Sequence, residues 1–140
     1  MRQILIKKNT IIFLLVSLLV ALIVGNRGDT RDTIIYYYVF RYIDILDLLN
    51  PAKFYIFTGM EIGFGWYCYL ISFITNSHIV LFTVFSFITF YVIYLVSRKI
   101  EVSPIFVLLL YLSSGYFLLL QFMQIRQGFA TPLALYALTI

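Results

Sequence analysis

The chain has little charge, one cysteine and one histidine, and each shortage argues against a class of protein. Of its 140 residues only 11% are charged, whereas about a quarter are charged in a soluble globular domain. This argues against a soluble enzyme, a disordered tail and a nucleic-acid-binding domain. The lone Cys68 rules out an internal disulfide, and with His78 it cannot complete a metal site of the usual kind. The sequence therefore predicts no metal, no cofactor and no nucleic-acid partner.

Apolar and aromatic residues dominate what is present. Hydrophobic residues make up 63% of the chain and aromatic residues 19%, with 12 tyrosines and 14 phenylalanines. Many of these rings lie at the edges of apolar runs, as they do in the interfacial belts of membrane proteins. The composition predicts an all-α, multi-pass protein that is embedded in a lipid bilayer.

The apolar runs predict about four to five membrane segments within one transmembrane domain covering residues 1–140. We expect these segments at 10–25, 54–75, 79–97, 104–120 and, as a partial span, 128–140. The first follows a basic stretch and supplies only one of the two small residues that signal peptidase requires, so we interpret it as an uncleaved anchor with a cytoplasmic N-terminus. The loop 26–53 is then extracytoplasmic, and an amphipathic helix is expected within it over 33–49.

Two topologies are open for the segment 54–75. If it crosses the membrane, Arg98 and Lys99 lie outside, against the positive-inside rule. If it is re-entrant or interfacial, both cations lie inside and Arg126 approaches the outer face. The length favours the first topology and the charges favour the second.

Three polar features stand out against this apolar background. Two arginines and two aspartates lie within 27–32, where they form either a solvated loop or a site for an anionic or sugar-rich headgroup. Glu61 lies in the apolar segment 54–75 and either caps a helix at headgroup level or faces a cavity. Arg126 lies among three glutamines in 121–127; it either reaches the interface or is a buried cation with an anionic partner. We expect Gln121, Gln124 and either Gln127 or Gly128 to form one polar stripe on a helix.

In their order along the chain, these features resemble motifs of the EpsG family of exopolysaccharide biosynthesis proteins, relatives of the Wzy-type O-antigen polymerases. Arg27, Asp32 and Tyr36 match the Arg, Asp and Tyr that follow the first span of that family. Residues 61–64 match its Glu-x-Gly-Phe/Tyr element, and 125–130 match its Ile-Arg-Gln-x-x-Ala element. Members of the family are more than twice as long, so the resemblance implies that this chain corresponds to their N-terminal part.

The resemblance implies a glycosyltransferase that polymerises polyprenyl-diphosphate-linked oligosaccharide repeats, located in the bacterial inner membrane beside other polysaccharide-assembly proteins. It assigns catalytic roles to Asp32, Glu61 and Arg126, and substrate binding to Arg27, Tyr36 and Gln127. In this scheme the two arginines bind the diphosphate, and one carboxylate orients or deprotonates the acceptor hydroxyl. Two alternatives stay open, namely a non-enzymatic accessory or transport subunit for lipid-linked sugars, and an inactive fragment.

Overall fold

The computed structural model describes residues 2–139, with side chains described for 8–30 and 32–139, and every regular element within that range is a helix. The described chain divides into two compact units. Unit 1 contains the residues up to Arg27 and those from Phe82 onward, and unit 2 contains Gly28–Leu81.

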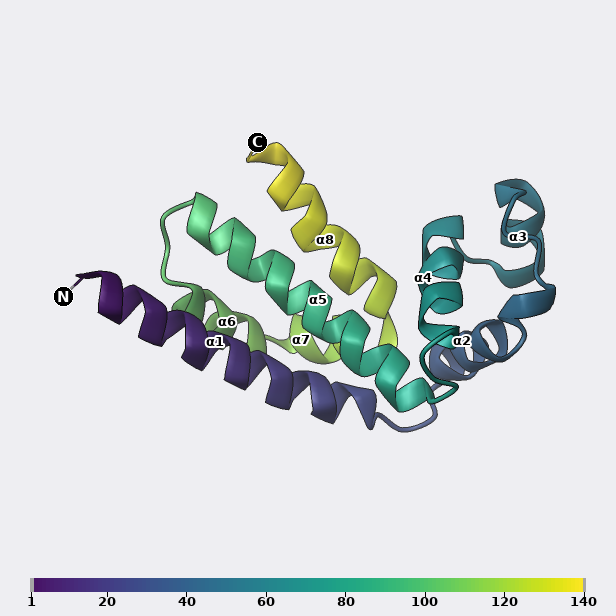
Figure 1. Ribbon diagram of the computed structural model, residues 1–140, viewed down its shortest axis with the longest axis horizontal. Helices are drawn as coiled ribbons and strands as arrows, with labels where there is room; N and C mark the ends of the chain where they lie inside the picture. Colours follow the sequence, from purple (N-terminus) through teal and green to yellow (C-terminus); the bar gives the residue numbers. More distant parts are fainter. Residues whose placement is uncertain (1, 140) are drawn as a thin grey trace. The chain divides into compact units, whose positions relative to one another are not determined.

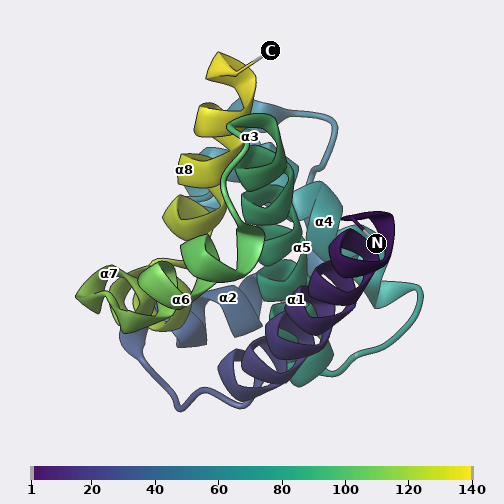
Figure 2. The same ribbon diagram turned by 90° about the vertical axis from the view of Figure 1, so that its left-hand side faces the viewer.

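Two long antiparallel helices form the frame of unit 1. This unit contains α1 (Arg2–Gly25), α6 (Pro104–Ser113), α7 (Gly115–Leu118), the π-helical turn η2 (Leu119–Met123) and α8 (Ile125–Leu138). It also contains most of α5 (His78–Lys99), namely the residues from Phe82 onward. Helices α1 and α5 run side by side in opposite directions (Figure 1), and α5 lies between α1 and α8 (Figure 2). At one end of the pair the hydroxyl groups of Thr10 and Tyr94 are 3.2 Å apart.

The core of unit 1 forms where α1, α5 and α6 meet. Its buried members are Phe13, Ala21, Phe90, Ile93 and Leu108. On α1 the buried positions recur at helical spacing, while the exposed positions of the same helix are also apolar and include Ile11, Leu15 and Leu19. A helix that is apolar on every face is typical of a membrane span, so the outward face of α1 suits contact with lipid.

Two helices are long and apolar enough to cross a membrane, namely Lys8–Gly25 within α1 and the whole of α5. A third span is possible only if Pro104–Ser113 and Gly115–Met123 act together, and these two segments meet at a bend of 79°. The structure therefore supports an all-helical membrane protein with two to three candidate spans, and the predicted number of four to five is not confirmed.

The bend interrupts the continuous helix expected over 104–120, and two serines account for it. The hydroxyl of Ser114 donates to the carbonyl of Tyr111 (2.7 Å) and that of Ser113 to the carbonyl of Leu110 (3.0 Å). Such bonds compete with the helical pattern of the backbone. Ser114 adopts an extended conformation, so α6 ends and the chain turns into α7.

Unit 2 contains four short elements: α2 (Arg31–Arg41), a 3₁₀ turn η1 (Ile43–Ile45), α3 (Pro51–Thr58) and α4 (Ile62–Ser72). Helix α2 starts at Thr30, whose hydroxyl accepts a hydrogen bond from the backbone N–H of Thr33. The prediction of a helix over 33–49 is wrong beyond Arg41. The apolar spacing continues there, but the Asp47 carboxylate accepts a hydrogen bond from the Leu49 N–H and so favours a turn.

The segment 54–75 contains two helices instead of one. Gly59 ends α3 in the left-handed conformation (φ 66°), and the Thr58 hydroxyl accepts a hydrogen bond from the Met60 N–H. With 8 and 11 residues, α3 and α4 are about 12 and 16 Å long. Each alone is too short to cross about 30 Å of hydrocarbon.

Candidate functional site

Arg27 is a buried cation at the end of the first long helix. It follows α1 and is only 6% exposed. Its Nη1 donates a hydrogen bond to the carbonyl oxygen of Gln121 (3.0 Å), and its guanidinium lies 3.5 Å from the ring centroid of Phe82. A cation over an aromatic face is attracted by the electron-rich ring. These contacts join the end of α1, the start of the unit 1 part of α5 and the π-helical turn.

Gln121 is the buried polar residue of that turn. Its backbone carbonyl receives the Arg27 bond, and its side-chain Nε2 donates to the Tyr111 hydroxyl (3.1 Å). The Oε1 atom of Gln121 is also buried, and no group among the described residues donates a hydrogen bond to it. A buried acceptor of this kind requires a water molecule or a ligand hydroxyl. The turn can therefore accept a hydrogen bond from a bound molecule through this oxygen.

Arg126 lies directly after this turn, in the first turn of α8. Gln124 precedes the helix with φ −119° and ψ 55° and provides no side-chain cap, and the first turn contains no acidic residue. The first N–H groups of a helix lack partners within the helix and carry a partial positive charge. Arg126 is half-buried and Gln127 is exposed. This helix start therefore suits an anion, because its first turn has N–H groups without helical partners and contains Arg126 and Gln127.

The predicted polar stripe of Gln121, Gln124 and Gln127 is wrong. The π-helical turn and the break at Gln124 rotate the chain, so that Gln121 is buried while Gln127 is exposed. Gly128 holds this arrangement together. A Cβ at this position would lie 2.9 Å from the backbone oxygen of Leu120, so only glycine allows the first turn of α8 to pack so closely on the preceding turn.

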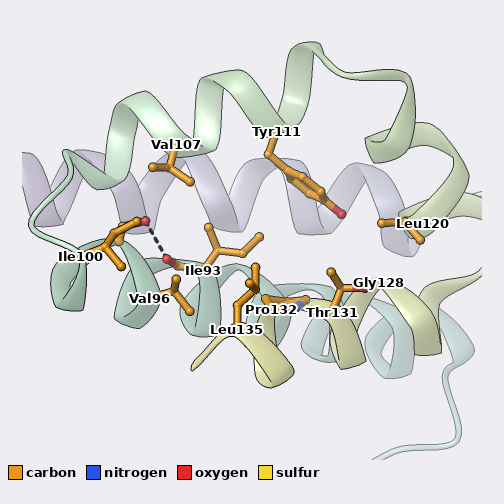
Figure 3. A pocket seen from close by; sticks show the side chains of 11 residues that line it. Ile93, Val96, Ile100, Val107, Tyr111, Leu120, Gly128, Thr131, Pro132 and Leu135 are labelled. Carbon is orange, nitrogen blue, oxygen red and sulfur yellow. Dashed lines mark hydrogen bonds between the residues drawn. The ribbon is translucent and has the colours of Figure 1, made fainter. Parts of the chain in front are cut away.

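An apolar groove of about 170 Å³ begins at Gly128 and runs between α5, α6 and α8 (Figure 3). Its apolar side chains are Ile93, Val96, Ile100, Val107, Leu120, Pro132 and Leu135. Tyr111 also borders the groove, and this side chain is the one that binds Gln121. The Ser97 hydroxyl, which would otherwise face the groove, donates to the carbonyl of Ile93 (2.7 Å). A cavity of about 150 Å³ holds a molecule the size of benzene, so this groove can hold part of a hydrocarbon chain.

The other three predicted site residues lie in unit 2. Asp32 is half-buried in the first turn of α2, and Tyr36 lies one turn later. The Tyr36 ring packs on Phe64, with centroids 5.3 Å apart. Glu61 is exposed and precedes α4, where its backbone carbonyl accepts a hydrogen bond from the Phe64 N–H (3.0 Å). Packing of α2 on α4 thus brings Tyr36 close to the start of the helix that Glu61 begins.

The six predicted residues therefore form two groups, with Arg27, Arg126 and Gln127 in unit 1 and Asp32, Tyr36 and Glu61 in unit 2. Sequence reasoning missed Phe82 and Tyr111, which contact Arg27 and Gln121. Both belong to apolar runs where aromatic residues are expected to face lipid or fill the core, so no local signal marks them. Within the described residues, no group of three potential metal ligands occurs.

Comparison with known proteins gives one family. The model of the EpsG family, a polysaccharide polymerase-like family, matches residues 10–140. This range covers most of the chain and contains all six predicted site residues. Neither a curated protein nor a solved structure matches the chain.

Proposed function

The chain belongs to the EpsG family, and from this premise we propose that it binds polyprenyl-diphosphate-linked oligosaccharides and takes part in their polymerisation. Family membership makes it a membrane protein related to exopolysaccharide biosynthesis. The finer proposal concerns the donor substrate, which has a hydrocarbon chain, a diphosphate and a sugar chain. Each part requires a different surface, and unit 1 has a suitable surface for the first two.

The observation that carries the proposal is the position of Arg126 at the start of α8. A diphosphate is a compact anion, and helix N–H groups together with a guanidinium bind such groups strongly. The adjoining π-helical turn is held by Arg27 through the Gln121 carbonyl. We therefore assign the diphosphate to the α8 start. Arg126 contacts it directly, Gln127 donates from its amide, and Arg27 adds positive potential and fixes the turn.

The apolar groove supports the same assignment, because it starts at Gly128, within one turn of Arg126. A polyprenyl chain bound there would leave its diphosphate at the α8 start. With a volume of about 170 Å³ the groove would hold only the first part of the chain, and the remainder would lie in the bilayer.

The chemistry of the proposal is a glycosyl transfer. The hydroxyl of an acceptor repeat attacks the anomeric carbon of the donor, the bond between that carbon and the phosphate oxygen breaks, and the polyprenyl diphosphate leaves with the bonding electrons. Arginines that bind the diphosphate stabilise the negative charge that develops on the leaving group. The acceptor proton passes to a carboxylate, for which we propose Asp32 or Glu61, and Tyr36 contacts sugar or lipid.

We also propose the topology in which 54–75 does not cross the membrane. Arg27 and Phe82 are in contact, so the segment between them leaves and rejoins unit 1 at the same end. The N-terminal cations and the pair Arg98 and Lys99 then share the other end of unit 1. With a cytoplasmic N-terminus, this arrangement satisfies the positive-inside rule and places Arg27 at the outer face.

The test compares Arg126→Gln with Arg41→Gln, a matched loss of one arginine from an exposed position on α2. Both variants are expressed at equal levels in cells whose polymer depends on this chain. We expect Arg126→Gln to shorten the polymer and to let single lipid-linked repeats accumulate at the outer face, whereas Arg41→Gln leaves both unchanged. An unchanged length distribution in Arg126→Gln would overturn the assignment. Repeats that fail to reach the outer face would instead indicate a transport role.

A further inference from the structure

A polar cleft of about 530 Å³ lies at the opposite end of unit 1 from Arg27. Asn9 and Thr10 of α1 line one side of it. The other side contains Arg98 at the end of α5, Glu101 in the loop that follows, and Ser103 before α6. Both candidate spans end at this level, because the first begins at Lys8 and the second finishes at Lys99. The cleft therefore lies at the depth of lipid headgroups.

The loop between α5 and α6 holds Glu101 in an unfavourable backbone conformation. The Val102 N–H donates to the Ser97 carbonyl (3.0 Å) and the Glu101 N–H to the Arg98 carbonyl (3.4 Å). This pair of bonds is the Schellman motif, in which the residue at the position of Glu101 is left-handed and is usually glycine. Glu101 has φ 58° and is the one described residue other than glycine with a positive φ. A glutamate is strained in this left-handed conformation, where glycine is not. We therefore infer that the carboxylate of Glu101 takes part in binding.

Two helix ends give the cleft a charge pattern. The C-terminus of α5 carries partial negative charge, and the N-terminus of α6 carries partial positive charge. Ser103 precedes α6 without a side-chain cap, and the N–H groups of Ile105 and Phe106 lie in the first turn. Glu101 adds negative charge to the first helix end, and Arg98 is available to an anion near the second. Among the described side chains, those of residues 8–30 and 32–139, none makes an ion pair or hydrogen bond with the Arg98 or Glu101 side chain.

From this pattern we propose that the cleft binds the headgroup of a zwitterionic phospholipid with a primary ammonium group, such as phosphatidylethanolamine. The phosphate binds Arg98, the Ser103 hydroxyl and the first N–H groups of α6. The ammonium group donates hydrogen bonds to the Glu101 carboxylate and lies near the α5 C-terminus. Asn9 and Thr10 close the cleft from α1.

Apolar side chains next to the cleft are placed to contact the acyl chains of the same lipid. Ile11 and Ile12 are exposed on α1 just beyond Thr10, and Phe106 is exposed on α6 just beyond Pro104. A free phosphate or a soluble zwitterion would gain nothing from these side chains. The surroundings therefore favour a membrane lipid as the source of the headgroup.

The test measures lipid retention by the full detergent-solubilised chain in native mass spectrometry. The lipids are dioleoyl phosphatidylethanolamine, the matching phosphatidylcholine, whose ammonium cannot donate hydrogen bonds, and the matching phosphatidylglycerol, which lacks an ammonium. The key variant is Glu101→Gly, because glycine suits the left-handed backbone, so the side chain and its carboxylate are removed without straining the loop. Arg98→Gln tests the phosphate contact, and Lys99→Gln is its control, since Lys99 is not part of the cleft.

We expect the wild-type chain to retain phosphatidylethanolamine about tenfold more tightly than the other two lipids, as one charge-assisted contact would give. Glu101→Gly should abolish this preference while the chain stays folded, and Arg98→Gln should weaken retention of all three lipids. Lys99→Gln should behave as the wild type does. Equal retention of the three lipids by the wild type, or an unchanged preference in Glu101→Gly, would overturn the proposal. Inorganic phosphate that displaces the lipid at equal concentration would indicate a simple anion site and would also overturn it.

Discussion

Replacing Gly65 by alanine tests how tightly unit 2 is packed around the start of α4. A Cβ at this position would lie 2.6 Å from Cζ and 2.8 Å from Cε2 of Phe54, and 3.0 Å from Cδ2 of Leu48. Phe54 is 1% exposed, so its ring has no free space into which it can move. Gly63, two residues earlier in the same helix, has no atom within 4 Å of the position of an added Cβ. The two glycines therefore form a matched pair.

The magnitude follows from two opposing effects. Alanine is favoured over glycine in a helix by about 1 kcal/mol, and this gain applies at both positions. Overpacking a filled core costs about 1–3 kcal/mol, and this loss applies at Gly65 alone. The difference in stability between the two variants therefore isolates the overpacking cost. It corresponds to about a 5- to 150-fold difference in how often unit 2 opens.

Cys68 provides the assay, because it is the single cysteine of the chain and lies fully buried in α4. A maleimide reagent can reach its thiol only when unit 2 opens locally, so the labelling rate in detergent reports that opening. We expect Gly65→Ala to be labelled 5- to 150-fold faster than Gly63→Ala. Equal labelling rates in the two variants would refute the packing described for α4 and for its contact with Phe54.

Three further outcomes follow from backbone and side-chain contacts. Gly128→Ala should destabilise unit 1 by about 1–3 kcal/mol, because its Cβ would press on the backbone of the preceding turn. A thermal melt followed by circular dichroism measures this loss. Gly115→Ala is the control: its Cβ would have no atom within 4 Å, so this variant should not lower the melting midpoint. Tyr111→Phe removes a hydrogen bond to a buried amide and should cost about 1 kcal/mol in the same melt. Gly59→Ala must hold alanine at φ 66° and should cost about 1–2 kcal/mol; unchanged labelling of the buried thiol would contradict this.

The long helices could be predicted from the sequence because their signals are local. The apolar runs at 10–25 and 79–97 coincide with α1 and α5, since helix formation in such runs requires no particular tertiary contact. The interruptions could not be predicted. Helix α3 ends at Gly59 in the left-handed conformation, beside a hydrogen bond to the Thr58 hydroxyl, and α6 ends at Ser114, whose hydroxyl donates to the backbone. Glycine, threonine and serine also occur inside continuous helices.

The candidate site was predictable only in part, for a related reason. Arg27 lies in a cluster of charges directly after an apolar run and Arg126 lies between two apolar runs, so both could be identified from the sequence. The π-helical turn that connects their surroundings depends on tertiary contacts of Gln121 with Arg27 and Tyr111. Arg27 is 94 residues and Tyr111 is 10 residues from Gln121, and no short pattern encodes their meeting.

The contact between Arg27 and Phe82 bears on how far the length of unit 2 can vary, in evolution or by engineering. Everything in unit 2 is inserted between two positions that touch. An insertion between touching positions can lengthen or shorten at little cost, since doubling a flexible loop costs only about 0.6 kcal/mol. Gly28–Leu81 therefore leaves unit 1 and returns to it at one place, and a change in its length puts little strain on the junction. A short turn in place of residues 28–77, which keeps the whole of α5, should leave the membrane frame intact.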